Sequence, residues 1–379
     1  MTATLTAPAP ASVATTDTMP PVENFWQGKR VLITGHAGFK GSWLCMILQR
    51  FGAKLYGFSL LPHAKPRIYN LLNIPELLTD ECIADISDSA ALADFVRRCE
   101  PEIVLHLAAQ PLVRESYRDP LTTYRTNVLG TLNVLEACHH CPSVKAVVNV
   151  TTDKCYENPE DGHAFVESDP LGGYDLYSSS KACSEILSAS YRRSLLQEPH
   201  AMCLATARAG NVIGGGDFAD DRLLPDCIRA LSDPDNGTIV LRYPQAIRPW
   251  QHVLEPLFGY ITLAQRLYQR ESAYCGAFNF GPEQSQVLSV EQVAQQVVKI
   301  WGSGQVQVEA HDHLHEAGLL LLDSSKAKQL LGFKPVLTAS EAIEWTVQWY
   351  QLWQQGAPSD VLRTLTRLQI SEFVALREA

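Results

Sequence analysis

The fold of this chain is decided by the stretch Thr34-Gly35-His36-Ala37-Gly38-Phe39-Lys40-Gly41, a turn with a glycine at every third residue. It follows the apolar run Val31-Leu32-Ile33, which predicts a buried strand, and precedes residues 42–48, which predict an apolar helix. The three glycines permit a tight turn, close approach of a pyrophosphate, and close packing of the helix on the strand. The helix N-terminus offers N–H groups and partial positive charge to phosphates. We therefore predict a dinucleotide-binding turn; the alternative is a turn whose glycines only allow close packing.

Length and composition exclude several classes of protein. The 379 residues are enough for a large core and more than one lobe. A formal net charge of -10 disfavours non-specific binding to nucleic acid or an anionic membrane, and no apolar run reaches the roughly 20 residues of a membrane span. Ten scattered cysteines without a signal peptide indicate the reduced thiols of a cytoplasmic protein. Residues 1–22, rich in Ala, Thr and Pro, are predicted to be a disordered tail.

Strand and helix patterns alternate along residues 23–209. After the first strand, strands are expected at residues 54–58, 103–109, 146–150 and 203–207, with one more that ends near residues 83–86. Helices are expected at 119–138 and 174–194. This order predicts an α/β fold, a Rossmann-like doubly wound parallel sheet with its binding groups at the carboxyl ends of the strands. Residues 210–379 are richer in glycine, proline and aromatic residues. They are expected to form mainly a smaller C-terminal α/β substrate-binding lobe, with some segments returning to the main sheet.

Three strand ends carry candidate cofactor contacts. Ser59 stands where an acidic residue is expected to hold the adenosine ribose of NAD, so this position leaves the choice between NAD and NADP open. Asp85 is predicted to accept a hydrogen bond from an adenine amino group, or else to cap the helix that starts near Ser89. The small side chains of Ala108 and Ala109 indicate close approach of the backbone to a flat ligand.

The second motif is Tyr177-Ser178-Ser179-Ser180-Lys181 on a predicted helix. Residues four apart share a helix face, and a lysine ammonium lowers the pKa of a neighbouring tyrosine from its usual value of about 10. Downstream of a dinucleotide turn, the pair predicts a general base that takes a proton from a sugar hydroxyl as hydride leaves the same carbon. The alternative is a surface helix pair without chemistry.

The third motif, Thr152-Asp153-Lys154, follows the strand at 146–150. Asp153 is predicted to act as a general acid if burial raises its pKa. Lys154 is predicted to act as a base if it is desolvated or lies near a second cation such as Lys181. The alternative is a helix cap with a solvated ion pair.

Two histidine-rich stretches suggest metal ligands but favour other interpretations. Cys138-His139-His140-Cys141 places four side chains in a row, which do not easily surround one ion, so a helix end before Pro142 is the better interpretation. His311, His313 and His315 alternate like one face of a strand and favour contact with an anionic ligand or a plain surface strand. We predict no metal site.

The turn, the Tyr177/Lys181 pair and the strand-end residues resemble the extended short-chain dehydrogenase/reductase family. Longer strings resemble its CDP-glucose 4,6-dehydratase branch, at residues 25–30, 38–43, 108–114, 152–156, 208–217 and 247–253. Lys154 is typical of that branch, because most sugar-nucleotide dehydratases have Glu after the Asp of the triplet.

The resemblance implies dehydration of CDP-glucose to CDP-4-keto-6-deoxyglucose, with NAD regenerated in every cycle. Tyr177 would take the proton of the 4-hydroxyl, Asp153 would protonate the leaving 6-hydroxyl, and Lys154 would remove the C5 proton. Thr152 would hydrogen-bond the 4-oxygen, and Lys181 would also hold the nicotinamide ribose. The rival hypotheses are an epimerase or a dehydratase for another nucleotide sugar, and a non-catalytic dinucleotide sensor.

The resemblance also implies binding residues and a homodimer or homotetramer that pairs through the two helices at 119–138 and 174–194. Cofactor contacts would come from Gly35, His36, Gly38, Phe39, Lys40, Gly41, Ser59, Asp85, Ile86, Leu107, Ala108, Ala109, Tyr177 and Lys181. Substrate contacts would come from Gln110, Arg114, Asn211, Arg222, Leu223, Arg248, His315 and Glu316. Among these, Asn211, Arg222 and Arg248 would hold the diphosphate, a task that suits the forked donors of arginine.

Overall fold

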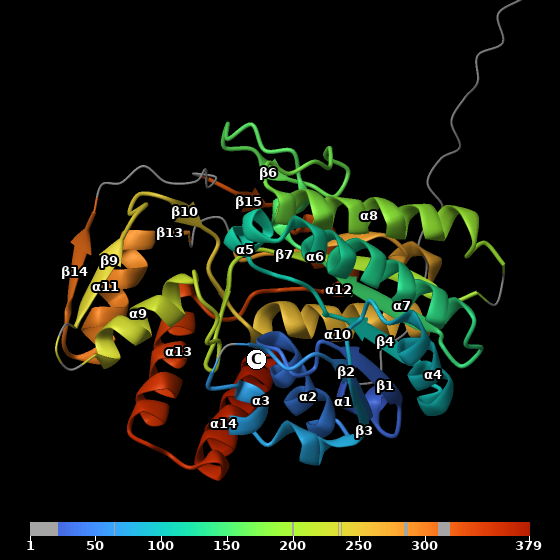
Figure 1. The fold of residues 1–379 in the computed structure, drawn as a ribbon, viewed down its shortest axis with the longest axis horizontal. Helices are drawn as coiled ribbons and strands as arrows, with labels where there is room; N and C mark the ends of the chain where they lie inside the picture. Colours follow the sequence, from blue (N-terminus) through green and yellow to red (C-terminus); the bar gives the residue numbers. More distant parts are fainter. Residues whose placement is uncertain are drawn as a thin grey trace, which may run out of the picture.

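A seven-stranded parallel sheet forms the centre of the molecule (Figure 1). The computed structural model describes residues 22–63, 65–198, 201–233, 235, 237–283, 287–309 and 319–379. The sheet strands are β1 Arg30–Thr34, β2 Lys54–Ser59, β3 Leu78–Ile83, β4 Ile103–His106, β5 Ala146–Val150, β7 Cys203–Ala209 and β12 Ala277–Phe280. They lie in the order β12-β7-β5-β4-β1-β2-β3, and each neighbouring pair is parallel. The predicted doubly wound α/β fold is confirmed.

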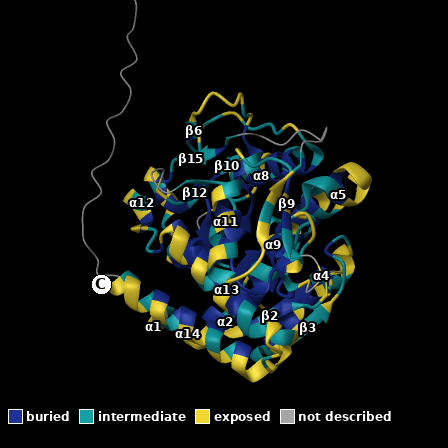
Figure 2. Cartoon of the chain, turned by 90° about the vertical axis from the view of Figure 1, so that its left-hand side faces the viewer, coloured by how far each residue is buried: buried dark blue, intermediate teal, exposed yellow. Residues whose placement is uncertain are grey.

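Helices cover both faces of this sheet because its central strands are apolar on both sides. In β1, Val31 and Ile33 face one core, whereas Leu32 faces the other. The helices concerned are α2 Phe39–Arg50, α4 Ser89–Cys99, α7 Gly130–His139, α8 Leu176–Ser194 and α10 Leu254–Tyr268. α2 and α10 contact each other on the first face, and α4, α7 and α8 pack on the second. Figure 2 shows the buried interior between these layers.

The helix predicted at 119–138 consists of three joined segments. They are α6 Pro120–Tyr124, the π-turn η2 Arg125–Leu129, and α7, with α5 Val113–Arg118 just before them. The Asp119 carboxylate caps α6 by accepting a hydrogen bond from the Thr122 N–H (2.9 Å). The strand predicted at 103–109 ends earlier, at His106, because the Gln110 backbone pairs with the Asn127 side chain instead of a neighbouring strand.

Residues after 210 contribute a smaller α/β layer beside the sheet, at the left of Figure 1. Its strands β9 Thr238–Leu241 and β14 Gln305–Val308 pair in parallel, and they pack with α9 Leu223–Ser232, α11 Val290–Trp301 and α13 Ala339–Gln354. Other segments of this region return to the main sheet, because β12 pairs with β7 and α10 packs against β5 and β7.

Short strand pairs and helices complete the fold. The pairs are β8 Val212–Ile213 with β11 Gln251–His252, β10 Ile247–Arg248 with β13 Leu288–Ser289, and β6 Ala164–Phe165 with β15 Leu321–Leu322. The remaining helices are α1 Val22–Trp26, α3 Ile68–Leu71, η1 Ile74–Leu77, η3 Asp153–Cys155, η4 Ser272–Tyr274, α12 Ser325–Leu331 and α14 Ser359–Glu378. The tail predicted at residues 1–22 lies outside the described residues, except Val22. Within the described ranges, each helix is too short or too polar to cross a bilayer.

Candidate active site

The glycine turn lies where the order of the sheet reverses, between β1 and β4, which is the usual ligand crevice of such a fold. Gly35 has φ of +76°, and a Cβ there would lie 2.8 Å from the Ala108 nitrogen. A Cβ at Gly41 would lie 2.1 Å from the Gly35 carbonyl oxygen. Gly38 precedes α2 and forms no side-chain cap. The turn therefore fits a pyrophosphate, because only glycine leaves room and the helix N-terminus is open to an anion.

The side chains of two turn residues point to different surroundings. His36 is fully buried; its Nε2 lies 2.9 Å from a Glu81 carboxylate oxygen, and its ring packs where Gly57 leaves space. A contact of His36 with a cofactor would therefore come from its backbone. The Lys40 side chain lies near Lys181 and Asp153, with its Nζ 6.0 Å from the centre of the Tyr260 ring.

The charges around Lys40 confirm where its side chain lies. Burial lowers the pKa of Lys40 to about 7, and the positive charges of Arg222 and Lys181 act in the same direction. The Asp153 and Asp217 carboxylates raise this pKa in part. Lys40 thus brings the glycine turn close to Lys181 of the second motif and Asp153 of the third.

The two residues predicted to contact the cofactor at the ends of β2 and β3, Ser59 and Asp85, form hydrogen bonds with residues close to them in the chain. The Ser59 hydroxyl donates to the Leu60 carbonyl (2.6 Å), and Asp85 accepts from the Ser87 N–H (2.8 Å). The alternative that Asp85 caps α4 is wrong, because Asp88 caps it by accepting from the Ala91 N–H. Ile86 packs beneath α7, and Leu107, Ala108 and Ala109 connect β4 to α5 beside the turn.

The tyrosine and lysine of the second motif are buried in the first turns of α8, being 8% and 5% exposed. The alternative of a surface pair is therefore wrong. The Asp175 carboxylate begins the helix by accepting a hydrogen bond from the Ser178 N–H (2.9 Å). Lys181 Nζ donates to the Val150 carbonyl at the end of β5 (3.1 Å), so α8 and β5 meet at this point.

The pKa values of this pair differ from expectation. Burial raises the pKa of Tyr177 to about 12, although a hydrogen bond with the Thr152 side chain acts the other way. Burial lowers the pKa of Lys181 to about 8, while the Glu185 carboxylate acts to raise it. The expected lowering of the Tyr177 pKa by Lys181 is wrong for the free chain, because burial disfavours the phenolate more strongly than its neighbours favour it.

The third motif lies against the second. The Thr152 hydroxyl donates to Asp153 (3.0 Å) and accepts from the Lys154 N–H (3.3 Å), which caps η3. Asp153 is only 2% exposed, so it is not part of a solvated ion pair. Its Oδ2 has no hydrogen-bond partner in the described part of the chain and lies 3.0 Å from an added Cβ at Gly210. Lys154 is half-buried.

Two of the predicted substrate residues form ion pairs, and the charge of one of them, Arg222, acts on Tyr177. Arg222 lies 3.7 Å from Asp217, and Arg114 lies 3.3 Å from Asp221. Asp221 also pairs with Arg242 (3.8 Å), a residue that no sequence motif singled out.

The other described residues predicted to bind substrate differ in their burial and in their hydrogen-bond partners. Arg248 is nearly buried and donates to the Ile247 carbonyl (2.9 Å). The Gln110 amide donates to Thr123 and to the Leu112 carbonyl, so its side chain supports the fold. Asn211 precedes β8, and Leu223 begins α9, both half-buried.

Of the two histidine-rich stretches, the structure describes residues 138–141 but not residues 311–316. His315 and Glu316, with His311 and His313, lie outside the described residues. α7 ends at His139, as the helix-end interpretation of residues 138–141 requires. No group of three or more potential metal ligands occurs among the described residues.

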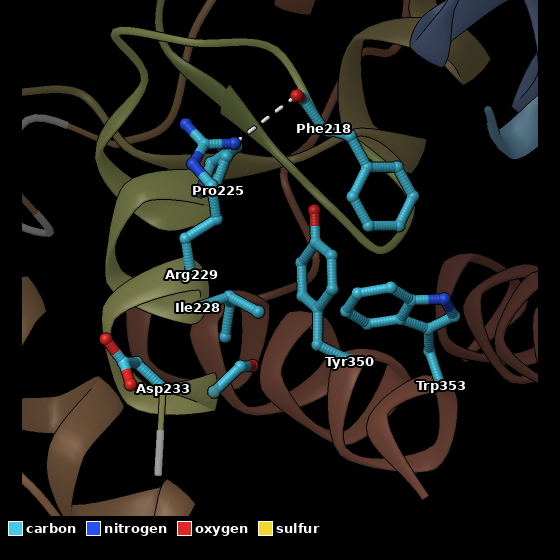
Figure 3. Close-up of a pocket in the computed structure, with 8 residues that line it drawn as sticks. Phe218, Pro225, Ile228, Arg229, Asp233, Tyr350 and Trp353 are labelled. Carbon is cyan, nitrogen blue, oxygen red and sulfur yellow. Dashed lines mark hydrogen bonds between the residues drawn. The ribbon is translucent and has the colours of Figure 1, made fainter. Parts of the chain in front are cut away.

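A separate cavity of about 210 Å³ lies between α9 and α13 (Figure 3). It is lined by Phe218, Pro225, Ile228, Arg229, Ser232, Asp233, Tyr350 and Trp353. None of the predicted site residues lines it. The Arg229 guanidinium donates a hydrogen bond to the Phe218 carbonyl (3.3 Å), so this contact links two residues of the cavity wall.

Sequence reasoning missed one buried pair behind the site. Glu185 on α8 and Arg208 on β7 form an ion pair of 2.9 Å. The available signal was the spacing, because Glu185 follows Lys181 by four residues and extends the same helix face.

A doubly wound sheet, a glycine turn after β1, and a buried tyrosine and lysine four residues apart define an extended short-chain dehydrogenase/reductase. More narrowly, the chain belongs to the GDP-mannose 4,6 dehydratase family, whose model matches residues 32–346.

Known proteins agree with this class. The chain is 43% identical to the CDP-glucose 4,6-dehydratase of Salmonella typhimurium over 93% of this chain and 98% of that one. It is 30% identical to the dTDP-glucose 4,6-dehydratase of Streptomyces antibioticus over 70% of this chain and 75% of that one. The structure of a dTDP-glucose 4,6-dehydratase double mutant from Streptomyces venezuelae, with NAD bound, has a TM-score of 0.74 and 24% identity. The match covers 85% of this chain and 97% of that one.

Proposed function

We propose that this enzyme is a hydro-lyase that dehydrates CDP-glucose to CDP-4-keto-6-deoxyglucose with NAD as its cofactor. The observation that carries the proposal is the burial of Asp153 beside Thr152, whose hydroxyl donates to it, with both side chains acting on the buried Tyr177. A base and an acid thus share one site. The Salmonella relative supports CDP-glucose as the substrate, and the NAD-bound dehydratase structure supports the cofactor.

Tyr177 and Lys181 would carry out the oxidation half of the reaction. Bound NAD would supply the acceptor for the C4 hydride and the source of the hydride that is returned to C6. Tyr177 takes the proton of the 4-hydroxyl, and its phenolate is favoured when a cationic nicotinamide ring lies near it. Thr152 would hold the 4-oxygen, and Lys181 on α8, whose Nζ lies at the carboxyl end of β5, would hold the nicotinamide ribose. The glycine turn at Gly35 and Gly41 holds the pyrophosphate.

Asp153 and Lys154 would carry out the elimination half. The 4-ketone acidifies the C5 proton, which Lys154 would remove and would give back to C5 when hydride adds at C6. The C6–O bond breaks as Asp153 gives its proton to the leaving hydroxyl, which departs as water. Asp153 Oδ2 is buried and has no hydrogen-bond partner among the described residues, so this oxygen is available to the leaving 6-hydroxyl.

A substrate panel tests the proposed function. Protein with NAD is given CDP-, UDP-, dTDP- and GDP-linked hexoses, and products are followed by mass spectrometry for loss of one water. We expect loss of water from CDP-glucose alone. Loss from another nucleotide sugar would replace the CDP assignment, and a bound cofactor without any loss of water would favour an epimerase or a non-catalytic sensor.

Asp153→Asn separates dehydration from epimerisation. An amide cannot supply the proton, so we expect water release from CDP-glucose to fall by about 10²- to 10⁴-fold while cofactor reduction partly persists. Rapid-quench mass spectrometry and the absorbance of reduced cofactor measure the two steps. Asp94→Asn on the exposed face of α4 is the control. Unchanged product formation in Asp153→Asn would contradict the role of Asp153.

We also propose a homodimer or homotetramer that pairs through α8 and the helix running from α6 to α7, and that works in the cytoplasm. Leu129 and Ile186 on these helices are 53% and 54% exposed, so each helix offers a large apolar side chain that a partner would cover. All ten cysteines are free, which supports a reducing compartment.

Ile186→Glu tests this assembly. A charge at the centre of an apolar interface would be left unpaired, so we expect the dissociation constant of the dimer to rise by at least tenfold. Analytical ultracentrifugation over a concentration series measures it. Leu368→Glu is the matched control, because Leu368 is also exposed but lies on α14. Equal effects of the two changes, or none, would contradict the proposed interface.

A further inference from the structure

The buried ion pair of Glu185 and Arg208 lies directly behind the catalytic side chains. The two side chains are 2% and 3% exposed. Tyr177, Lys181 and Glu185 follow one another at four-residue intervals, so they share one face of α8. The pair therefore begins one helical turn from Lys181.

Glu185 holds the chain just before the catalytic tripeptide Thr152-Asp153-Lys154. The Thr151 hydroxyl donates to Glu185 Oε1 (2.5 Å), and the Thr206 hydroxyl donates to Oε2 (2.7 Å). These contacts join the carboxyl end of β5, strand β7 and helix α8 at one carboxylate.

Arg208 holds the chain just after the tripeptide. Its Nη1 donates to the Tyr156 hydroxyl (2.7 Å) and to the Glu167 carbonyl (3.2 Å), and its Cζ lies 4.8 Å from the centre of the Tyr156 ring. The Tyr156 hydroxyl in turn donates to the Asn279 side chain on β12 (2.8 Å). Both sides of the tripeptide are thus tied to a single ion pair.

We propose that the Glu185–Arg208 pair is a clamp that sets the position of Thr152-Asp153-Lys154 relative to Tyr177 and Lys181 on α8. This inference rests on the proposed function, because it assigns the pair to the geometry of that same site. Both members act through other residues, so they are positioning residues.

Stability alone is a weak reason for such a pair. Removing two charges from water costs several kcal/mol per ion, and apolar replacements of a whole buried pair are often neutral or stabilising. The pair instead connects α8, β5, β7 and β12 around the catalytic tripeptide, and these contacts fix the position of the tripeptide.

The clamp predicts unequal effects on the two halves of the reaction. Oxidation moves hydride from C4 to the cofactor and the 4-hydroxyl proton to Tyr177, which stays on α8 with Lys181. Elimination removes the C5 proton and releases the 6-hydroxyl with a proton from Asp153, which the clamp holds. A displacement of about 1 Å can cost a step about 10²-fold. Loosening the clamp should therefore slow elimination more than oxidation, because Thr152 is the one member of the tripeptide that takes part in oxidation, and reduced cofactor should accumulate.

The test uses two variants of the full chain with NAD and CDP-glucose. Glu185→Leu combined with Arg208→Met removes both charges and leaves neither buried alone, whereas Glu185→Gln keeps the shape and loses the charge. We expect water release to fall about 10²-fold in the double variant and less in Glu185→Gln. The fraction of cofactor in the reduced form should rise during turnover. Glu255→Gln is the control, because Glu255 is equally buried but bonds the backbone of Val336 and Leu337.

Hydrogen exchange gives a second readout that does not depend on activity. Amides of residues 151–156 should exchange faster in the double variant than in the wild type or Glu255→Gln, while those of α8 keep their protection. Equal losses of oxidation and elimination, or unchanged exchange at 151–156, would overturn the clamp. If the wild type neither reduces cofactor nor releases water, the proposed function fails, and the exchange measurement still decides for or against the clamp.

Discussion

Tyr177→Phe is expected to lower water release from CDP-glucose by about 10²- to 10⁴-fold, because the phenol that takes the 4-hydroxyl proton is gone. The ring itself remains, so the packing of this buried residue changes little. Cofactor reduction should fall by the same factor, since oxidation at C4 is the step that Tyr177 serves. Steady-state rates and the absorbance of reduced cofactor measure the two quantities.

This outcome separates Tyr177 from the residues of the elimination half. Asp153→Asn should leave cofactor reduction partly intact, whereas Tyr177→Phe should remove it. Tyr56→Phe on β2 is the control, because it makes the same change at a residue that is not among the predicted site residues. Cofactor reduction by Tyr177→Phe at the wild-type rate would show that another group takes the proton.

Gly41→Ala is expected to abolish NAD binding and lower the free energy of unfolding by about 1–3 kcal/mol, the usual cost of overpacking a buried site. The new Cβ would lie 2.1 Å from the Gly35 carbonyl oxygen and 2.7 Å from the His36 Cα, so the turn and α2 must move apart. Alanine favours a helix over glycine by about 1 kcal/mol, which opposes this loss. The clash involves backbone atoms that cannot rotate away, so we expect it to win.

Thermal unfolding and titration with NAD measure both parts of this prediction. Gly276→Ala is the matched control, because its Cβ would meet only the flexible Lys326 Nζ at 3.5 Å. The hypothesis that the glycines serve packing alone predicts lost stability in Gly41→Ala with normal NAD affinity in the molecules that remain folded. Normal stability together with normal affinity would contradict the tight geometry of the turn.

The sequence alone determined the class of fold and the three motifs of the site. Val31–Ile33 and the later apolar runs are buried on both faces of the sheet. Continuous apolar runs are typical of parallel strands covered on both faces, so these runs indicate a parallel sheet. The glycines of the turn and the four-residue spacing of Tyr177 and Lys181 are local patterns. Local patterns survive in the sequence because they depend on neighbours only a few residues away.

Only the tertiary structure decided how these motifs meet. His36 turns toward Glu81, 45 residues away, and Asp221 joins Arg114 to Arg242. The Tyr177 pKa is raised rather than lowered, because burial depends on the whole fold. Glu185 and Arg208 find each other across 23 residues. Such contacts depend on which distant segments pack together. Burial in the packed fold then shifts the pKa of each ionisable group. Spacing along the chain reveals neither the contacts nor the pKa shifts.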